Sequence, residues 1–284
     1  MRLVARMAPA GAFAVYLALA AGGCSAPPAP PSLPAAAPPP AFAAGEIVDL
    51  SHGYDQQAIF WPTAEPFRLE KVADGMTPAG FYYAANNFFT SEHGGTHMDA
   101  PVHFARGKDG AGEVPLDRLI GSAVVIDVTA AAAANPDYLV TVADLEQWEK
   151  QNGAIGPDSI LLLRTGFSRH WPDAAKYLGT AERGEAAVAK LHFPGLHPDA
   201  AKWIVANRPI RAIGIDTASI DFGQSTQYES HRILYERNIP GLENLTALER
   251  LPARGATVIA LPMKIMGGSG APLRAIAVLP TSGK

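Results

Sequence analysis

Three histidines and an aspartate stand within eleven positions of the segment SEHGGTHMDAPVHF, residues 91–104. They are His93, His97, Asp99 and His103. Imidazole nitrogens together with a carboxylate oxygen suit Zn²⁺, and also Mn²⁺ or Fe²⁺. Three protein ligands leave one coordination position open, which is typical of a catalytic rather than a structural ion. The segment therefore predicts a catalytic metal site.

The residues between these side chains predict a tight loop rather than a helix. Gly94, Gly95 and Pro101 oppose an unbroken helix, and glycines permit positive φ and close backbone packing around an ion. Gly94 also excludes the HExxH zinc motif, because no glutamate fills the general-base position. Each ligand has an ordinary structural alternative: a histidine can be hydrogen-bonded in the core, and Asp99 can cap the turn before Pro101. Four such residues together favour the metal.

A single α/β domain over residues 45–284 is the predicted frame for this site. No second Pro/Gly/Ser-rich break and no internal repeat divides this range. Several strand-like runs are continuously apolar, as in strands that are covered on both faces. The expected strands are 46–50, 81–89, 123–129, 159–167, 211–216, 256–263 and 273–279. The expected helices are 141–153, which opens with a Thr-x-x-Asp cap, 198–208 and 229–238. This mixture indicates a mixed sheet with flanking helices.

The N-terminus has the layout of a secretory signal over residues 1–23. Arg2 and Arg6 precede the short apolar run of residues 10–23, which ends in small residues and is too short for a comfortable membrane span. The sequence AAGGCS resembles a bacterial lipoprotein signal, with Cys24 as the lipidated first residue of the mature chain. Acyl chains on Cys24 would tether the protein without spanning the bilayer. The alternative is a plain signal peptide with an incidental cysteine.

A proline-rich stalk is expected over residues 24–44, after the signal. Half of the residues in 25–40 are proline, so this stretch cannot bury a core. A semi-rigid polyproline spacer of this length reaches up to about 50 Å at ~3.1 Å per residue. We therefore expect an exported protein that is held at the periplasmic face of a bacterial membrane. A disordered tail is the alternative.

The overall charge and the cysteine content exclude several classes of protein. The net charge is −4 and no cluster of Lys or Arg is present, which argues against a nucleic-acid surface or a polybasic membrane patch. The single cysteine excludes an internal disulfide framework and any zinc site that needs several cysteines. A small-molecule substrate is the remaining expectation.

The motif HGGTHMDAPVHF resembles the H-x-G-T-H-x-D-x-P-x-H signature of the metal-dependent cyclase-like hydrolases, a family that includes bacterial kynurenine formamidases and isatin hydrolases. Later blocks of the chain are also similar to that family: 161–167, 214–221, 230–245 and 261–274. The resemblance implies a swivelling β/β/α-like fold, hydrolysis of a C–N amide bond, and a homodimer. The signal and the stalk lie outside the resemblance.

The resemblance also implies roles for the residues of the motif. His93, His97 and Asp99 would hold a first metal ion, and His103 would act as the catalytic acid and base. Its imidazole, with an ordinary pKa near ~6.5, can remove a proton from water and then protonate the departing nitrogen. The hydroxyls of Thr96 and Ser91 are candidates to orient a ligand imidazole. Both are equally well explained as ordinary turn hydroxyls.

A second ion is implied by the formamidase-type members, in which it shares the motif aspartate with a distant histidine and glutamate. His231 and Glu243 match those positions in this chain. From the residues alone, His231 would be a histidine on a helix surface and Glu243 a solvated charge. Members that resemble isatin hydrolase use a single manganese, so Zn or Mn is expected as one or two ions.

Aromatic residues near the motif suggest the kind of substrate. Trp61, Phe88 and Phe89 could flank the metal and cover a planar ring, such as that of an aryl amide or a lactam-like compound. Ordinary packing is the alternative for each. We therefore expect an exported, isatin hydrolase-like enzyme that acts on a small cyclic or aryl amide. The alternatives are kynurenine formamidase activity, which fits poorly with export, or a non-catalytic lipoprotein that binds a metal or ligand.

Overall fold

The computed structural model describes residues 45–280 of the chain. The predicted signal (1–23), the lipidated Cys24 and the stalk (24–44) lie outside the described residues, and these predictions therefore stay predictions. Among the helices of residues 45–280, none combines the length and the apolar character that crossing a membrane requires.

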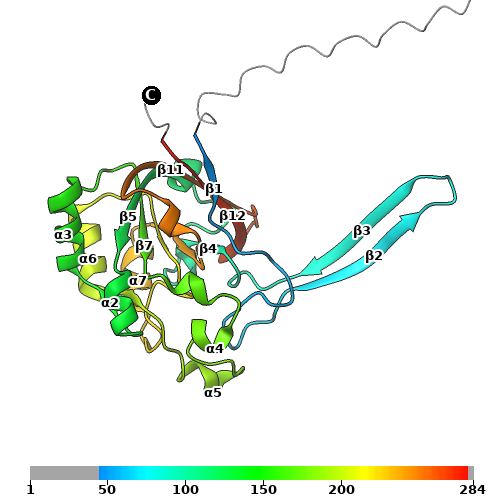
Figure 1. Cartoon of the computed structure of the whole chain (residues 1–284), viewed down its shortest axis with the longest axis horizontal. Coiled ribbons are helices and arrows are strands. Elements are labelled where there is room, and N and C mark those ends of the chain that lie inside the picture. Colours follow the sequence, from blue (N-terminus) through cyan, green and yellow to red (C-terminus); the bar gives the residue numbers. More distant parts are fainter. Residues whose placement is uncertain (1–44, 281–284) are drawn as a thin grey trace, which may run out of the picture. The chain divides into compact units, whose positions relative to one another are not determined.

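An eight-stranded mixed sheet forms the centre of the fold (Figure 1). Its strands follow the order β1-β12-β11-β5-β7-β9-β10-β4, and β4 also pairs with β12. The bounds are β1 Ile47–Asp49, β4 His97–Asp99, β5 Ile120–Asp127, β7 Ser159–Arg164, β9 Ala212–Ile215, β10 Gly241–Glu243, β11 Arg254–Pro262 and β12 Gly270–Val278. The neighbouring strands β5, β7, β9 and β10 run parallel, and the other pairs of this sheet are antiparallel. The sheet thus curls round until β4 bridges β10 and β12.

Residues 45–280 contain seven α-helices. They are α1 Leu116–Leu119, α2 Thr129–Ala134, α3 Val142–Asn152, α4 Ala174–Tyr177, α5 Glu185–Val188, α6 Pro198–Asn207 and α7 Glu229–Tyr235. Helices α3 and α6 lie side by side on one side of the sheet (Figure 1). The side chains of Thr141 and Asp144 form the expected capping box at the start of α3, and Pro198 opens α6. The predicted α/β class with a mixed sheet and flanking helices is confirmed.

Two separate cores explain why the strand sequences are continuously apolar. Along β7, Ile160 and Leu162 enter one core, which contains residues of β10, β11 and β12. Leu161 and Leu163 alternate with them and enter the other core, against α3 and α6. Because successive side chains of a strand point to opposite faces, a strand that is covered on both sides needs apolar residues at every position.

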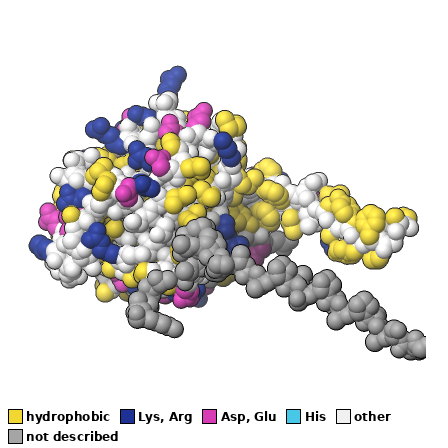
Figure 2. All heavy atoms as spheres, turned by 90° about the horizontal axis from the view of Figure 1, so that it is seen from above, with side chains coloured by type: hydrophobic (Ala, Val, Ile, Leu, Met, Phe, Trp, Pro, Cys, Tyr) yellow, Lys and Arg dark blue, Asp and Glu magenta, His cyan; other side chains and the backbone are white. Residues whose placement is uncertain are grey.

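A two-stranded arm leaves the body of the molecule (Figure 1). It consists of β2 (Arg68–Met76) and β3 (Tyr82–Phe89), which pair only with each other. Its apolar side chains are exposed, and Figure 2 shows hydrophobic side chains gathered along it. The sequence predicts the strand over 81–89 correctly but not its position outside the core. A second small sheet joins β6 (Leu139–Val140) to β8 (Gly195–Leu196).

Candidate metal centre

Strand β4 positions two of the predicted ligands between two neighbouring strands. His97 and Asp99 begin and end β4, and all three residues of this strand are buried. Residues that are directly opposite on antiparallel strands carry their side chains on the same face. Glu243 on β10 is opposite His97 in this way, so a short stretch of pairing brings together residues 146 positions apart in the chain.

The segments on either side of β4 supply the other two residues of the motif. His93 precedes the strand in a turn, and His103 ends a short 3-10 helix, Pro101–His103. Gly95 has a φ of +56°, a left-handed conformation that glycine adopts without strain. A Cβ atom at Gly94 would lie 2.0 Å from the ring of Phe60. The expected tight loop is therefore present, and both glycines are needed for it.

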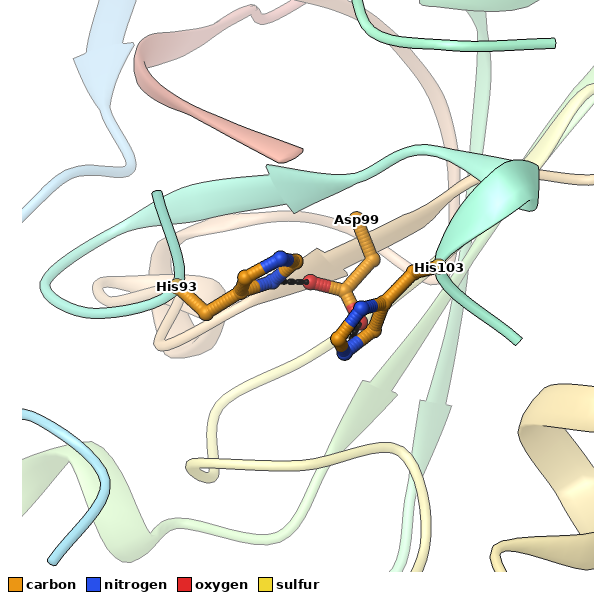
Figure 3. Close-up of side chains that lie close together, drawn as sticks. All are labelled: His93, Asp99 and His103. Carbon is orange, nitrogen blue, oxygen red and sulfur yellow. Dashed lines mark hydrogen bonds and ion pairs between the residues drawn. The ribbon is translucent and has the colours of Figure 1, made fainter. Parts of the chain in front are cut away.

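Five predicted ligands converge on one point around Asp99. Its Oδ1 lies 2.7 Å from Nδ1 of His93 and 3.1 Å from Nε2 of His97. On the other side, Oδ2 lies 3.4 Å from Nε2 of His231. Glu243 closes the group, with one carboxylate oxygen 3.0 Å from His231 Nε2 and the other 3.4 Å from His97 Nε2. Figure 3 shows two of these ligands, His93 and Asp99, together with His103 beside them.

Each of the three histidine ligands has its second ring nitrogen hydrogen-bonded to a partner other than Asp99 and Glu243. The three pairs are His93 Nε2 with Ser269 Oγ (2.9 Å), His97 Nδ1 with the carbonyl of Gly95 (3.0 Å), and His231 Nδ1 with Asp221 Oδ2 (2.5 Å). Such partners fix the tautomer and the orientation of a metal-binding imidazole. Nε2 of His97 is buried and makes no hydrogen bond of acceptable geometry. Three oriented imidazole nitrogens and two carboxylates, with one of the nitrogens lacking a hydrogen bond, form a donor set that fits a divalent cation.

The charges of this cluster depend on one another. Burial would raise the pKa of Asp99, but the facing imidazoles of His93, His231 and His97 hold this pKa well below its usual value. Burial raises the pKa of Glu243, and the neighbouring charge of Asp99 raises it further. Burial opposes the charged form of His231, yet its hydrogen bonds to carboxylates raise its pKa well above the usual value. The buried carboxylates thus favour a positively charged partner at the centre of the cluster.

His103 lies at the rim of the cluster and differs from the other histidines. Its ring stacks on that of His93 with the centroids 3.8 Å apart. Its Nε2 lies 3.9 Å from Asp99 Oδ2, which is too long for a hydrogen bond. Burial lowers the pKa of His103 to about 4 despite the opposing effect of Asp99, so the imidazole is neutral at neutral pH. A neutral imidazole at the edge of the site can accept a proton.

A cavity of about 280 Å³ opens onto the cluster and is lined by all six predicted chemical residues. Trp61 lies in its wall, as expected from the sequence, together with two further aromatic residues, Phe104 and Tyr228. The rings of Phe104 and Tyr228 stack with centroids 5.1 Å apart, and Trp61 meets Tyr228 edge-on at 6.5 Å. A small volume between flat apolar walls suits one planar ring system.

Phe88 and Phe89 do not line this cavity, contrary to the expectation from the sequence. They lie on β3 in the arm and are 54% and 44% exposed. Phe88 stacks against Phe67, and the guanidinium of Arg68 lies over the ring of Phe89. The reason is that β3 pairs with β2 and carries its aromatic residues away from the body before the chain returns to the motif.

Several residues that support the site lie outside the motif and could not be identified from it. Ser269 and Asp221 hold ligand histidines from segments far along the chain. Asn244 donates a hydrogen bond to the carbonyl of Gly95, the same oxygen that faces His97. Only their position within or beside the later family-like blocks could have indicated them, because their contacts depend on the folded chain.

Known proteins resemble the chain in both sequence and structure. The model of a family described as "Putative cyclase" matches residues 48–222. An isatin hydrolase of Roseibium aggregatum is 35% identical over 209 residues, which cover 71% of this chain and 77% of the relative. A kynurenine formamidase of Salinibacter ruber is 31% identical over 190 residues, which cover 66% of this chain and 76% of the relative.

Two solved structures extend this likeness to the fold. An isatin hydrolase bound to the product analogue thioisatinate has a TM-score of 0.76 and 31% sequence identity, over 83% of this chain and 93% of that structure. Isatin hydrolase A of Labrenzia aggregata bound to benzyl benzoate has a TM-score of 0.75 and 35% identity, over 84% and 95%. Both likenesses cover more than four fifths of this chain.

Proposed function

The chain belongs to the cyclase family of hydrolases, and from that premise we propose that it is a metal-dependent amidohydrolase that opens a small cyclic or aryl amide at its C–N bond. The observation that carries the proposal is the convergence of three oriented imidazoles on Asp99 and Glu243, beside the neutral imidazole of His103. Similarity to isatin hydrolases and kynurenine formamidases supports the reaction type.

The side chains on both sides of Asp99 would hold the ion or ions. His93 and His97 offer nitrogens to one side of Asp99, and His231 offers one to the other, with Glu243 between His97 and His231. When bound, a zinc or manganese ion supplies Lewis acidity, which makes water a stronger acid and polarises a carbonyl oxygen. Both ions accept this set of nitrogen and oxygen donors, in one or two positions.

His103 would move the protons of the reaction. Its neutral ring lies at the cavity wall, where it can take a proton from the attacking water and then deliver that proton to the departing amide nitrogen. Stacking on His93 holds the plane of the ring, and the distance to Asp99 leaves its Nε2 without a fixed hydrogen bond there. The ligand histidines are oriented by a hydrogen bond on the nitrogen that faces away from the cluster, whereas His103 is positioned by stacking.

The aromatic walls support a planar substrate. Trp61, Phe104 and Tyr228 surround a volume that accommodates a single flat ring system beside the cluster. An isatin-like cyclic amide is therefore the first candidate. An N-formyl aryl amine is the second, because His231 and Glu243 complete the far side of Asp99 as in the formamidase-type pattern.

A hydrolysis screen combined with metal analysis tests this function. Purified protein is assayed with isatin, N-formylkynurenine, hydantoins and lactones, before and after chelation and after return of Zn²⁺ or Mn²⁺. We expect opening of an aryl or cyclic amide that is lost on chelation and regained with the ion. Turnover that survives exhaustive chelation would contradict the proposal. A fully metal-loaded protein that opens none of these compounds would favour a non-catalytic metal- or ligand-binding lipoprotein.

The location belongs to the same proposal. A short positive region, an apolar run and Cys24 support export followed by lipid attachment at the periplasmic face of a bacterial membrane. The variant Cys24→Ser should then move the protein from the detergent-extracted membrane fraction to the aqueous fraction. Recovery of both forms in the same fraction would contradict lipid attachment.

A homodimer is the proposed assembly, and the arm supports it. Two-stranded hairpins without a covering surface are marginally stable in water. Apolar side chains project from both faces of the arm, and eight of them are between 44% and 69% exposed: Leu69, Val72, Met76, Phe81, Tyr82, Tyr83, Phe88 and Phe89. At roughly 200 Å² for each large side chain, they offer on the order of 900 Å². A standard interface buries about 800 Å² per partner, so a second copy of this chain can supply the missing cover.

A further inference from the structure

Asp221 is a buried carboxylate whose two oxygens serve two different parts of the site. It follows β9 in the chain and is 2% exposed. Its Oδ2 accepts hydrogen bonds from the backbone N–H and from Nδ1 of His231, at 3.1 and 2.5 Å. Acceptance by a carboxylate keeps a proton on Nδ1, which leaves Nε2, the nitrogen that faces Asp99 and Glu243, as the one that would bind an ion. The ligand nitrogen of His231 is thus set by Asp221.

The other oxygen of Asp221 holds the loop that leads into α7. Its Oδ1 accepts hydrogen bonds from the Ser225 hydroxyl at 3.3 Å and from the Ser230 backbone N–H at 3.2 Å. The oxygen of Ser225 in turn accepts the backbone N–H of Tyr228 at 3.1 Å. The same carboxylate therefore fixes two residues of the loop, Ser225 directly and Tyr228 through its hydroxyl, and one residue in the first turn of α7, Ser230.

Tyr228 is the residue of this loop that reaches the cavity. It has a φ of +48°, a left-handed conformation that a bulky residue keeps only when its surroundings enforce it. Its ring lines the cavity, stacks on Phe104 and lies 6.3 Å from the ring of His231. The hydrogen bond from its backbone to Ser225 is one of the contacts that hold this conformation.

We infer that Asp221 is a positioning residue that couples the metal ligand His231 to the loop 222–230, and thereby to the aromatic wall formed by Tyr228. The inference rests on the proposed metal-dependent function. An ion that binds Nε2 of His231 fixes that ring, and the ring and Asp221 then fix the loop. Filling the metal site should therefore order the wall against which a planar substrate lies.

Two variants test the role of Asp221, one at the carboxylate itself and one at its contact with the loop alone. Asp221→Asn keeps the shape but removes the charge that faces Nδ1 of His231, whereas Ser225→Ala removes only the link from Oδ1 to Tyr228. Asp216→Asn is the matched control, because Asp216 is an equally buried carboxylate that binds the backbone N–H groups of Thr165 and Gly166 instead. Zn²⁺ affinity is measured by competition with a chelator. Amide hydrogen exchange over residues 222–230 is measured with and without Zn²⁺, and circular dichroism verifies folding.

In the wild-type chain, Zn²⁺ should slow exchange over 222–230. Asp221→Asn should bind Zn²⁺ about 10–100-fold more weakly, as is usual when a partner of a ligand histidine is lost. Ser225→Ala should bind Zn²⁺ as tightly as the wild type does, because the ligands and the contact between Asp221 and His231 stay in place. Its loop should exchange faster than the wild-type loop and gain little protection from the ion. The control should keep both the affinity and the protection.

Unchanged Zn²⁺ affinity in folded Asp221→Asn would overturn the inference, as would wild-type loop exchange in Ser225→Ala. Should Asp221→Asn fail to fold, Ser225→Ala decides the outcome alone, because Ser225 is a half-buried loop residue outside the hydrophobic core. A wild-type chain that binds no Zn²⁺ would contradict the proposed function together with the inference. Failure of the inference alone leaves wild-type binding intact.

Discussion

At the scale of single residues, Asp99 is the centre of the site, because one carboxylate oxygen faces His93 and His97 and the other faces His231. Its buried position would be costly for an uncompensated charge. The facing imidazoles compensate it in the chain alone, and an ion would do so more strongly. Removing this carboxylate would therefore affect both halves of the centre.

The stability of the chain should depend on pH through His52. Burial lowers the pKa of His52 to about 4 from an ordinary 6.5, with Asp49 opposing the shift, and the ring stacks on Trp171. Between these two values the unfolded chain binds more protons than the folded chain, so stability falls as pH decreases from 6.5 to 4. Allowing for partial exposure, the contribution is on the order of 2 kcal/mol.

Urea unfolding of the chelated protein across this pH range tests the effect. His52→Phe preserves a flat ring against Trp171 and removes the titration, so its loss of stability toward pH 4 should be smaller than that of the wild type. Parallel stability curves for the two proteins would show that His52 does not contribute.

The ligands of the site can largely be predicted from residue types, but the residues that orient those ligands cannot. The motif identifies His93, His97, Asp99 and His103, because so dense a set of donors has few other uses. His231 and Glu243 are indicated only by resemblance to a family, since each is unremarkable in its own segment. The hydroxyls of Thr96 and Ser91, expected as partners of ligand imidazoles, bond instead to the backbone oxygens of Asn244 and Glu65. The actual partners come from distant segments.

At the scale of elements, the turn before β4 determines whether the ligands converge. Gly95→Ala places a side chain at φ +56°, with its Cβ 2.6 Å from the ring of Tyr54. We expect a loss of about 1–3 kcal/mol of stability and weaker Zn²⁺ binding, because His93 and His97 flank the turn. Gly80→Ala is the matched control: its φ is +85°, but a Cβ there meets no atom within 4 Å.

Thermal unfolding and Zn²⁺ titration measure both effects of Gly95→Ala. Gly80 lies in the turn of the arm, so its variant should lose stability only through backbone strain and bind Zn²⁺ as the wild type does. Equal Zn²⁺ affinity in the Gly95→Ala protein would show that the turn does not place the ligands.

Elements were predictable where the pattern of the sequence is local. The capped helix expected over 141–153 is Val142–Asn152, and the apolar run 159–167 contains the buried strand Ser159–Arg164. The strand β4 was not predicted, since three residues carry no periodicity and its pairing with β10 and β12 is set by distant segments. For the same reason the closure of the sheet could not be predicted.

At the scale of the whole molecule, the arm should hold two copies of the chain together. Leu69 and Phe88 are directly paired across the arm and share one face. Changing both to Ser removes apolar area from that face, so the dimer should dissociate at higher concentration than the wild-type dimer. Asn87→Ser, a polar change in the same strand, is the control.

Size-exclusion chromatography with light scattering over a range of concentrations measures the assembly. We expect a dimer for the wild type and for Asn87→Ser, and a monomer–dimer equilibrium for the double variant. A monomeric wild type, or a double variant that dimerises as tightly, would contradict the role of the arm.

The turnover of His103→Ala, measured together with its metal content, tests the central claim most directly. Loss of the acid/base should lower kcat by about 10²–10⁴-fold on the amide that the wild type hydrolyses. Metal content should be unchanged, because the oriented nitrogens of His93, His97 and His231 remain. The exposed His192, which pairs with Asp137, provides the control in His192→Ala. A fully loaded His103→Ala protein with a kcat near that of the wild type would contradict the account.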